Sequence, residues 1–385
     1  MQEQVFGFFM PSVNLMGVGA AKQVGERIKS LGKKKALIVT DAGLYKFGVA
    51  DQIAGYIREA GVEVAIFPGA EPNPTDKNVE AGLTAFQTEG CDAIVSLGGG
   101  SSHDCAKGVG LVAANGGTIH EYEGVDRSQT PMIPMIAINT TSGTASEMTR
   151  FCIITDTSRS VKMAIVDKHV TPAISINDPL LTVKKPPALT AATGMDALTH
   201  AVEAYVSTAA TPITDACALQ AIRLVSQYLR AAVANGEDIV ARDKMSYAQL
   251  LAGMAFNNAS LGYVHAIAHQ FGGFYNLPHG VCNAILLPHV ERFNLIAKPE
   301  RFVDIAIALG EDASGLSTRA AAEKALEAIV TLARDVNIPR GFAELGAKEE
   351  DIPLLAENAM KDACSFTNPR KATLDEVQAM IRAAF

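Results

Sequence analysis

The sequence has no excess of positive charge and no long apolar run. It contains 33 Lys and Arg against 41 Asp and Glu, which gives a net charge of −8 and a pI near 5.6. A chain with this charge lacks the excess of basic residues that is typical of proteins that bind nucleic acid or an anionic membrane surface. No stretch of about 18 apolar residues is present, so we expect no transmembrane helix. We therefore expect neither a nucleic acid nor a membrane as a partner.

Cysteine is scarce and scattered. The six cysteines never form a C-x-x-C pair, and isolated cysteines in a long chain are usually the buried thiols of a cytosolic protein. The N-terminal segment 1–11 contains Glu3 and lacks the basic region and long apolar core of a signal peptide. These absences predict a cytoplasmic protein.

The chain also has no internal repeat and no low-complexity segment. At 385 residues it is too long for one typical core, so we expect two domains. The first half alternates short apolar runs with amphipathic stretches, which is typical of a parallel sheet with helices on both faces. The expected strands are 36–40, 62–67, 93–97, 135–139, 151–155, 162–166 and 173–177, with 151–155 and 162–166 forming a hairpin, and the expected helices between them include 49–60 and 78–89.

The sequence pattern changes after Lys184-Lys185-Pro186-Pro187. From there on, Ala- and Leu-rich helical patterns predominate and no convincing strand occurs. We therefore predict an α/β domain with a Rossmann-like parallel sheet over residues 1–184 and an all-helical domain over residues 185–385. The expected helices of the second domain include 194–206, 215–235, 241–258, 300–309 and 317–336.

A glycine-rich loop, Gly98-Gly99-Gly100-Ser101, follows the strand expected at 93–97 and leads into a helix expected from about His103 to Ala114. Glycine lets the backbone approach a phosphate closely, and a helix N-terminus offers unpaired N–H groups to it. The loop is not the G-x-G-x-x-G fingerprint, because His103 stands in the last position. A tight turn without a ligand is an alternative explanation of the glycines.

Asp41 follows the first expected strand, at the end where open parallel sheets bind their ligands. A carboxylate there can accept both ribose hydroxyls of an adenosine group and repels a 2′-phosphate, which favours NAD over NADP. An N-cap for the helix after Ala42 is an equally good interpretation.

The stretch 139–147 follows another strand and is rich in hydroxyls, among them Thr140, Thr141 and Thr144. These groups suit a pyrophosphate or a nicotinamide pocket. Alternatively, Thr144 and Glu147 have the spacing of a capping box.

Acidic and histidine side chains recur at helical spacing in the second half. Asp196 and His200 form an i, i+4 pair, His265 and His269 form another, and His279 follows ten residues later. Side chains at i and i+4 lie on one face of a helix. Imidazole and carboxylate suit Zn, Fe(II), Mn or Co, and a site with three or four protein ligands leaves room for a substrate oxygen. The combination favours a metal site over isolated structural histidines.

The spacing alone does not say which histidines bind. His289 follows Pro288 outside the i, i+4 pairing and is left out, and His103 is expected to be a helix residue rather than a ligand. Together the two halves predict a metal- and NAD-dependent dehydrogenase, with NAD across the α/β domain, the metal in the helical domain and the substrate in the cleft between them. The metal would act as a Lewis acid on an alcohol oxygen, and a neighbouring histidine would carry the released proton.

Four motifs of this chain resemble those of the iron-containing (group III) alcohol dehydrogenases. They are Gly98-Gly99-Gly100-Ser101, Asn139-Thr140-Thr141-Ser142-Gly143-Thr144, the stretch from Gly194 to Tyr205, and His265-Ala266-Ile267-Ala268-His269-Gln270. The resemblance covers residues 11–370 and is greatest to bacterial NAD-dependent enzymes for short primary alcohols such as ethanol, methanol and 1,3-propanediol. It implies a dehydroquinate synthase-like N-terminal fold, NAD with Fe²⁺, Zn²⁺ or another divalent metal, a small alcohol or aldehyde as substrate, and a homo-oligomer, dimeric or larger.

The resemblance also implies site residues. Asp196, His200, His265 and His279 would bind the metal, and His269 would line the substrate pocket as a proton relay. From the motifs and the resemblance together, the residues expected to contact NAD are Asp41, Asn73, Gly98, Gly99, Gly100, Ser101, Asp104, Lys107, Thr140, Thr141, Thr144, Thr149, Lys162 and Leu181.

The chain departs from the family pattern at Ser102, where Pro is common, and at Ser142, where Ala is common. Ser102 is expected to loosen the glycine turn slightly, because Pro would pre-set the first helical residue. Ser142 adds a hydroxyl near the cofactor.

Two alternatives stay open at this point. One is another enzyme of the same fold, a glycerol dehydrogenase or a dehydroquinate synthase-like lyase; the other is a regulatory protein that binds NAD or metal without turnover. The lyase would need many basic residues for its phosphorylated substrate, and a sensor needs no histidine beside an open metal site. The residues near the metal motifs are apolar instead, which suits a small alcohol: Phe256, Leu261, Tyr263, Phe271 and Phe274.

Overall fold

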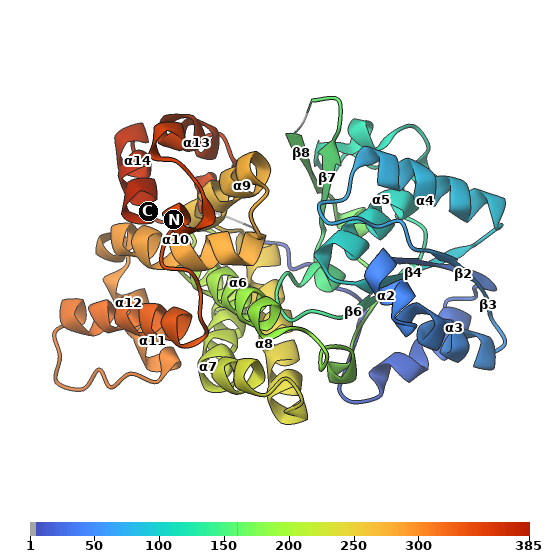
Figure 1. Cartoon of the computed structure of the whole chain (residues 1–385), viewed down its shortest axis with the longest axis horizontal. Helices are drawn as coiled ribbons and strands as arrows, with labels where there is room; N and C mark the ends of the chain where they lie inside the picture. Colours follow the sequence, from blue (N-terminus) through green and yellow to red (C-terminus); the bar gives the residue numbers. More distant parts are fainter. Residues whose placement is uncertain (1–4, 160) are drawn as a thin grey trace. The chain divides into compact units, whose positions relative to one another are not determined.

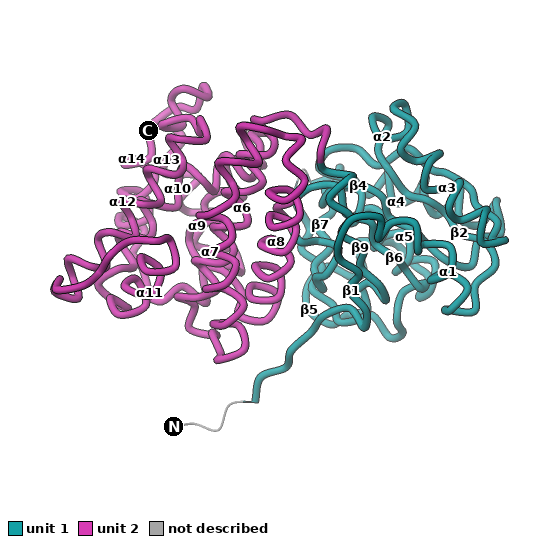
Figure 2. The backbone as a smooth tube through the Cα atoms, turned by 90° about the horizontal axis from the view of Figure 1, so that it is seen from below, with its two compact units in different colours: residues 1–141, 145–182 teal, residues 142–144, 183–385 magenta. Residues whose placement is uncertain are grey.

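The computed structural model describes residues 5–159 and 161–385. The first four residues, which begin the segment where we expect no signal peptide, lie outside them. The chain divides into two compact units, shown in different colours in Figure 2. Unit 1 comprises residues 1–141 and 145–182, and unit 2 comprises residues 142–144 and 183–385. The short segment 142–144 joins unit 2 through a close approach at Gly143, where an added Cβ would lie 2.7 Å from the Cβ of Thr193.

Unit 1 is built on a six-stranded parallel sheet in the order β1-β9-β6-β4-β2-β3. Its strands are β1 (Val13–Met16), β2 (Lys35–Thr40), β3 (Glu63–Phe67), β4 (Ala93–Gly98), β6 (Met135–Asn139) and β9 (Ile174–Asn177). The α-helices of the unit are α1 (Val24–Ser30), α2 (Ala42–Lys46), α3 (Val49–Glu59), α4 (Asp76–Thr88) and α5 (Gly100–Asn115).

The central strands bury both faces. On β2, Leu37 and Val39 belong to the same apolar core as the buried side chains of α4 and α5. The alternate residues Ala36 and Ile38 belong to a second core with α1 and α3. This two-sided burial is why the strands read as continuous apolar runs in the sequence. Figure 1 shows α4 and α5 on one face of the sheet and α3 on the other.

A smaller three-stranded sheet lies in the same unit. It contains β5 (Gly124–Val125), β8 (Val161–Val166) and β7 (Phe151–Asp156), in that order, and β7 and β8 are antiparallel as expected for a hairpin. Short 3₁₀ helices complete the unit: η1 (Ala20–Gln23), η2 (Ile119–Tyr122), η3 (Ser146–Met148), η4 (Lys168–Val170) and η5 (Pro179–Leu181).

Unit 2 is helical throughout its described residues. Its centre is α6 (Pro187–Val206), which is buried along almost its whole length and packs against α7, α8 and α10. The other α-helices are α7 (Pro212–Ala234), α8 (Ile239–Ala259), α9 (Tyr263–Tyr275), α10 (His279–Asn294), α11 (Pro299–Leu309), α12 (Thr318–Asp335), α13 (Ile352–Ala359) and α14 (Leu374–Ala383), with 3₁₀ turns η6 (Leu295–Ala297), η7 (Phe342–Leu345), η8 (Glu349–Asp351) and η9 (Ala363–Thr367).

The expected fold class is confirmed: a parallel sheet with helices on both faces is followed by a helical unit. Some details of the expectation are wrong. Strand β1 was not expected, because it has only four residues and Asn14 interrupts its apolar pattern. The helix after the glycine loop begins at Gly100 and not near His103, and α6 begins at Pro187, where Pro occupies the first helical position.

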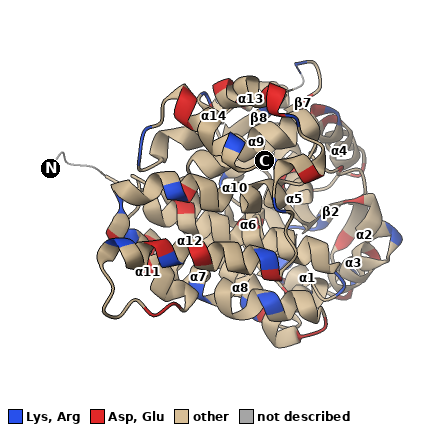
Figure 3. Ribbon diagram, turned by 60° about the vertical axis from the view of Figure 1, so that its left-hand side comes forward, with Lys and Arg blue, Asp and Glu red and all other residues tan. Residues whose placement is uncertain are grey.

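In the described part of the chain, no helix is both long and apolar enough to cross a membrane. Figure 3 shows Lys and Arg interspersed with Asp and Glu along the helices of unit 2, and pairs such as Arg292 with Glu323 and Arg230 with Asp335 join opposite charges there.

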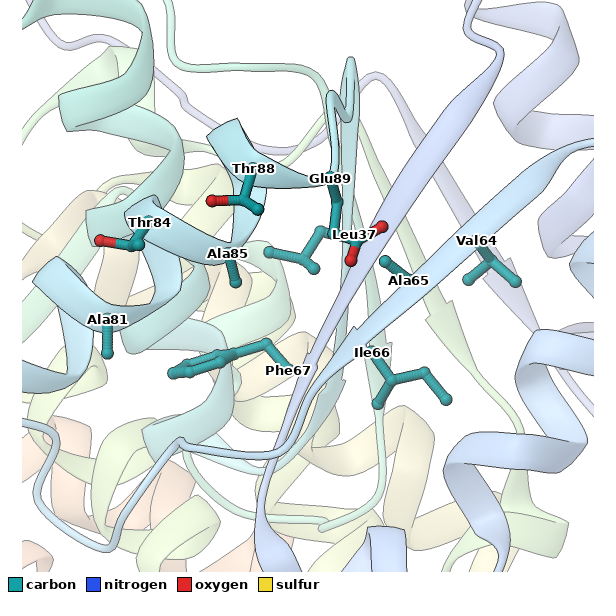
Figure 4. Close-up of a pocket in the computed structure, with 10 residues that line it drawn as sticks. All are labelled: Leu37, Val64, Ala65, Ile66, Phe67, Ala81, Thr84, Ala85, Thr88 and Glu89. Atoms are coloured by element: carbon teal, nitrogen blue, oxygen red, sulfur yellow. The ribbon is translucent and has the colours of Figure 1, made fainter.

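A pocket of about 540 Å³ lies between α4 and the edge strand β3 (Figure 4). None of the residues predicted for the active site lines it. Its wall is mostly apolar and is formed by Leu37, Val64, Ala65, Ile66, Phe67, Ala81, Thr84, Ala85, Thr88 and Glu89.

Candidate active site

Three helices of unit 2 bring four predicted metal ligands together. Asp196 and His200 lie one turn apart on α6, His265 lies in the first turn of α9, and His279 is the first residue of α10. One ligand atom from each of the four lies within 4.8 Å of all the others. The Nε2 atom of His279 is 3.6 Å from Asp196 Oδ1, and the Nδ1 atom of His200 is 4.0 Å from Asp196 Oδ2.

A glycine allows the start of α10 to approach α6 this closely. A Cβ added at Gly280 would lie 2.4 Å from the backbone oxygen of Ala192, a distance that real Cβ atoms do not adopt. Gly280 directly follows His279, so the close backbone contact places that histidine beside Asp196.

The chemistry of the four side chains fits a divalent metal ion. Burial lowers the pKa of His200, and burial together with the neighbouring histidines lowers the pKa of His265 well below its ordinary value, so both imidazoles are neutral and can donate a lone pair. The Nδ1 atom of His200 is buried without a hydrogen-bond partner in the described residues. One carboxylate and three imidazoles match the ligands that Fe(II) and Zn accept.

Glu203, which the sequence analysis did not single out, contacts the cluster through His265. Its carboxylate accepts the N–H of Val264 at 2.7 Å at the start of α9, and its Oε2 atom is 2.5 Å from His265 Nδ1. Burial raises the pKa of Glu203 well above its ordinary value, and the backbone N–H groups of α9 oppose that shift. When His265 donates its Nδ1–H to Glu203, its Nε2 lone pair points to the cluster, which is the usual arrangement of a metal-binding histidine.

His269 lies beside the ligand cluster with a different partner. Its ring centroid is 6.0 Å from that of His265 and 5.5 Å from that of His279. Its Nδ1 atom is 2.8 Å from Asp362 Oδ2, and its side chain is 32% exposed. Burial raises the pKa of Asp362, but its interactions with His269 and its hydrogen bonds with Cys364 together lower that pKa overall. The arrangement leaves Nε2 of His269 available to accept a proton.

The apolar neighbours expected around the metal divide into two groups. The ring of Phe256 stacks on His200 with centroids 4.2 Å apart. Phe271 is buried against Phe342 at a centroid distance of 3.6 Å, and Phe274 is 52% exposed. Of these three phenylalanines, therefore, Phe256 is the one stacked on a ligand.

In unit 1 several of the predicted NAD-contacting residues lie at the carboxyl ends of the neighbouring strands β2, β4 and β6. Gly98 ends β4 and pairs with Asn139 of β6, and the N–H of Thr140 donates to the Gly98 carbonyl at 2.9 Å. Gly98 has φ +150°, and a Cβ there would lie 2.3 Å from Ser102 Oγ, so both the backbone and the space require glycine. The glycine loop and the Thr140-Thr141 segment therefore lie side by side.

The helix after the glycine loop presents an N-terminus without a side-chain cap. Gly99 is the N-cap residue of α5 and has no side chain to cap the first N–H groups. The hydroxyls of Thr40 and Thr140, at the ends of β2 and β6, are buried without partners in the described residues. Uncapped N–H groups and unpaired hydroxyls at the carboxyl edge of a parallel sheet fit a dinucleotide phosphate group.

Asp41 fulfils the capping role considered from the sequence. Its Oδ1 accepts the N–H of Leu44 at 2.9 Å at the start of α2, and β2, which it follows, lies next to β4. The side chain is only partly buried, so capping does not preclude contact with a ribose.

Two further predicted residues pair with each other: Lys162 Nζ donates to Asn73 Oδ1 at 2.8 Å. Lys107 is fully buried, and its ammonium donates to the carbonyls of Thr149 and Phe151 at 2.9 and 2.6 Å. Asp104 accepts from Ser146 at 2.8 Å. Asp104, Lys107 and Thr149 thus form an interior network around η3. Leu181 packs against the core that contains α1 and α3.

The capping-box interpretation of Thr144 and Glu147 is wrong. Residue Ala145 precedes η3 with φ +52°, and no side chain caps that turn. The two other histidines behave as expected. His103 lies within α5 with Nδ1 2.7 Å from Ser96 Oγ, and burial lowers its pKa to about 3; His289 lies in the interior of α10, outside the ligand cluster.

A separate polar cluster in unit 1 contains Asp76, His120 and Asp156. The Nε2 atom of His120 is 3.3 Å from Asp76, and Arg159 donates to Asp156 at 2.5 Å. Hydrogen bonds from Ser158 and Arg159 hold the pKa of Asp156 below its ordinary value. The cluster is an internally paired network of opposite charges.

Comparisons with known proteins identify the family of the chain. The iron-containing alcohol dehydrogenase family model matches residues 11–179, and the model of the C-terminal region of the Fe-containing alcohol dehydrogenase family matches residues 190–385. The chain is 56% identical to a 1,3-propanediol dehydrogenase of Klebsiella pneumoniae over 100% of both chains, and 56% identical to an NAD-dependent methanol dehydrogenase of Bacillus methanolicus over 98% of this chain and 99% of that one. A crystal structure of a 1,3-propanediol oxidoreductase matches 99% of this chain and 100% of its own with a TM-score of 0.98 and 57% identity.

Proposed function

Because the chain belongs to the iron-containing alcohol dehydrogenase family, we propose that it interconverts short primary alcohols and their aldehydes with NAD as the hydride carrier. The observation that carries the proposal is the pairing of a four-residue ligand cluster with the His269–Asp362 pair beside it. The relatives that act on 1,3-propanediol and methanol make unbranched alcohols of one to four carbons the first substrates to test.

The metal-binding residues we propose are Asp196, His200, His265 and His279. A divalent metal held there supplies a Lewis acid that lowers the pKa of the alcohol hydroxyl. Fe²⁺ follows from the family, and the same ligands hold Zn²⁺ or another divalent ion. Glu203 fixes the ring of His265, and the stacked ring of Phe256 holds His200 in place.

His269 is proposed as the proton relay. With Nδ1–H donated to Asp362, the imidazole presents its Nε2 lone pair and can take the alcohol proton. Its partly exposed ring can then release that proton to water. Asp362 stabilises the imidazolium that forms between the two transfers.

In unit 1 we propose that the uncapped start of α5 and the residues of the glycine loop bind the NAD pyrophosphate. Asp41 would accept ribose hydroxyls and exclude a 2′-phosphate. We propose residues 1–184 as the NAD-binding domain and residues 185–385 as the metal-binding domain. The remaining contacts proposed for NAD are Asn73, Asp104, Lys107, Thr140, Thr141, Thr144, Thr149, Lys162 and Leu181.

We also propose a cytoplasmic homo-oligomer. The six cysteines are free thiols, which agrees with a reducing compartment. Light scattering of the purified protein measures the oligomer size.

The test is a substrate panel with purified, metal-loaded protein. Ethanol, 1,3-propanediol or another short primary alcohol should produce NADH, EDTA should abolish the reaction, and added Fe²⁺ or Zn²⁺ should restore it. Glycerol in the same panel separates a glycerol dehydrogenase. Absence of turnover with every primary alcohol and aldehyde of one to four carbons would refute the proposal.

A further inference from the structure

Asn283 contacts the ligand cluster, and none of the roles proposed above explains these contacts. It stands on α10 one turn after His279 and is fully buried. Its Nδ2 atom is 2.7 Å from Asp196 Oδ1, 3.0 Å from His265 Nε2 and 3.1 Å from His279 Nε2. One amide nitrogen therefore contacts three of the four proposed ligand atoms.

The amide and a metal ion need the same electron pairs. An amide NH₂ group is only a donor and has two hydrogens, which the Asp196 carboxylate and the two imidazole nitrogens facing it share as acceptors. Each neutral imidazole has one accepting nitrogen with one lone pair. For His265, the donor at Nε2 requires the proton to be on Nδ1, and Glu203 lies 2.5 Å from that atom. The lone pair that accepts from Asn283 is thus the one that would bind a metal.

The carbonyl oxygen of the same amide indicates that Asn283 also adopts another arrangement. Asn283 Oδ1 is buried and has no hydrogen-bond partner in the described residues. A buried carbonyl without a partner is unfavourable and rare in native structures. The amide of Asn283 therefore donates toward the ligand atoms while its own acceptor has no partner in the described residues.

We propose that Asn283 is a placeholder for the metal: its amide holds the ligands of the metal-free protein in position and competes with the incoming ion for their lone pairs. The inference rests on the metal centre of the proposed function. It predicts an effect opposite in sign to that of a supporting residue. Removing Asn283 should destabilise the metal-free protein and strengthen metal binding, whereas removing a residue that supports the bound metal weakens binding.

The test compares wild type with Asn283→Ala by titrating metal-free protein with Co²⁺ against a chelator of known affinity. Co²⁺ absorption in the visible region reports ligand binding independently of turnover. We expect the dissociation constant for Co²⁺ to fall by about 5- to 10-fold, because the ion no longer displaces the amide hydrogen bonds. The unfolding temperature of the metal-free form should fall by about 2–4 °C, with a smaller change in the Co²⁺-loaded form.

Asn294→Ala is the matched control. Asn294 is a buried amide on the same helix, bonded to Glu291 and Asn368 and not to the cluster. It should lower the unfolding temperature of both forms equally and leave the Co²⁺ dissociation constant unchanged. Asn283→Ser, which keeps one donor, should fall between wild type and Asn283→Ala in both measurements and serves if the alanine variant does not fold.

Weaker Co²⁺ binding by Asn283→Ala, or unchanged binding with equal destabilisation of both forms, would overturn the placeholder role while leaving the metal centre intact. A wild-type protein that does not bind Co²⁺ would overturn the metal centre and this inference together.

Discussion

At the scale of single residues, the site depends on which nitrogen of each histidine is occupied. Glu203 faces Nδ1 of His265 and Asp362 faces Nδ1 of His269, so two histidines of one helix have the same kind of partner. Their surroundings separate their roles. His265 is buried within the ligand cluster, whereas His269 lies outside it and is partly exposed. Burial and position, more than residue type, distinguish the proposed ligand His265 from the proposed proton carrier His269.

Replacing His269 by Ala should lower kcat with a short primary alcohol by about 100-fold, because general acid–base catalysis by a positioned histidine contributes that much or more. Metal content, measured by elemental analysis on the same sample, should stay near that of wild type. Asp362→Asn should lower kcat less, since the imidazole remains but loses the carboxylate that stabilises its charged form. If His269→Ala instead loses the metal, His269 is a ligand and the assignment of roles is wrong.

Glu291 provides a second prediction, on the pH dependence of stability. Burial raises the pKa of this carboxyl to about 8, partly opposed by the hydrogen bond from Asn294. In the unfolded chain the Glu291 carboxyl ionises near pH 4.3. Between about pH 4.3 and 8 the folded state therefore binds more protons than the unfolded state. The free energy of unfolding then falls as pH rises, by at most about 1.4 kcal/mol per pH unit.

Urea unfolding at pH 6 and pH 8 measures this effect. Glu291→Gln keeps the shape and cannot ionise, so the variant should lose less stability than wild type between the two pH values. Equal losses in both proteins would show that Glu291 is ionised in the folded state, contrary to its burial.

At the scale of elements, helical spacing explains why part of the site was predictable. Asp196 and His200 were found by their i, i+4 spacing on α6, and Glu203, one further turn along the same face, follows the same rule. Asn283 likewise stands one turn after His279 on α10. Neither residue completes an acid–histidine or histidine–histidine pair at i, i+4 spacing, so that spacing alone does not indicate them. Their position one turn from a proposed ligand on the same helix face does.

Other parts could not be read from the sequence. Asp362 is 93 positions from His269 and comes from a 3₁₀ turn, so no local periodicity links them. The buried strands of the large sheet were predicted to within one residue or so at most ends, because two-sided burial leaves an unbroken apolar run. The four-residue β1, in which Asn14 interrupts the apolar run, leaves no such signal, and the sequence does not predict it.

Asp41 connects an element boundary to cofactor choice. Asn is as good an N-cap as Asp, so Asp41→Asn should keep the bond to Leu44 and remove only the charge. We expect kcat/KM with NADP to rise by about 10-fold, or about 1.4 kcal/mol, as repulsion of the 2′-phosphate is lost. Asp41→Ala should in addition lower stability by about 1 kcal/mol through loss of the cap. If Asp41→Asn and wild type have the same preference for NAD over NADP, Asp41 does not contact the ribose.

At the scale of the whole molecule, the proposed cofactor site and the proposed metal site lie in different units, and each site suits the secondary structure of its unit. A parallel sheet presents backbone N–H groups and hydroxyls along one edge, which suits a phosphate-containing cofactor. A helical unit presents side chains from several helix faces, which suits a metal ion that needs ligands from different directions. The proposed ligands come from α6, α9 and α10 and span positions 196 to 279, so a bound ion would join helices that are distant along the chain.

That division predicts where metal removal will act. An ion that binds only the folded state stabilises it by about 4 kcal/mol when present at 1,000 times its dissociation constant, so EDTA should lower the unfolding temperature and added Zn²⁺ or Fe²⁺ should restore it. Hydrogen–deuterium exchange should locate the change: amides of α9 and α10 should exchange faster in the chelated protein, while those of β4 and β6 should be unaffected. The sheet thus serves as an internal control within the same sample. Faster exchange throughout both units would indicate general destabilisation by EDTA, and unchanged exchange in α9 and α10 would mean that the four side chains do not hold the ion.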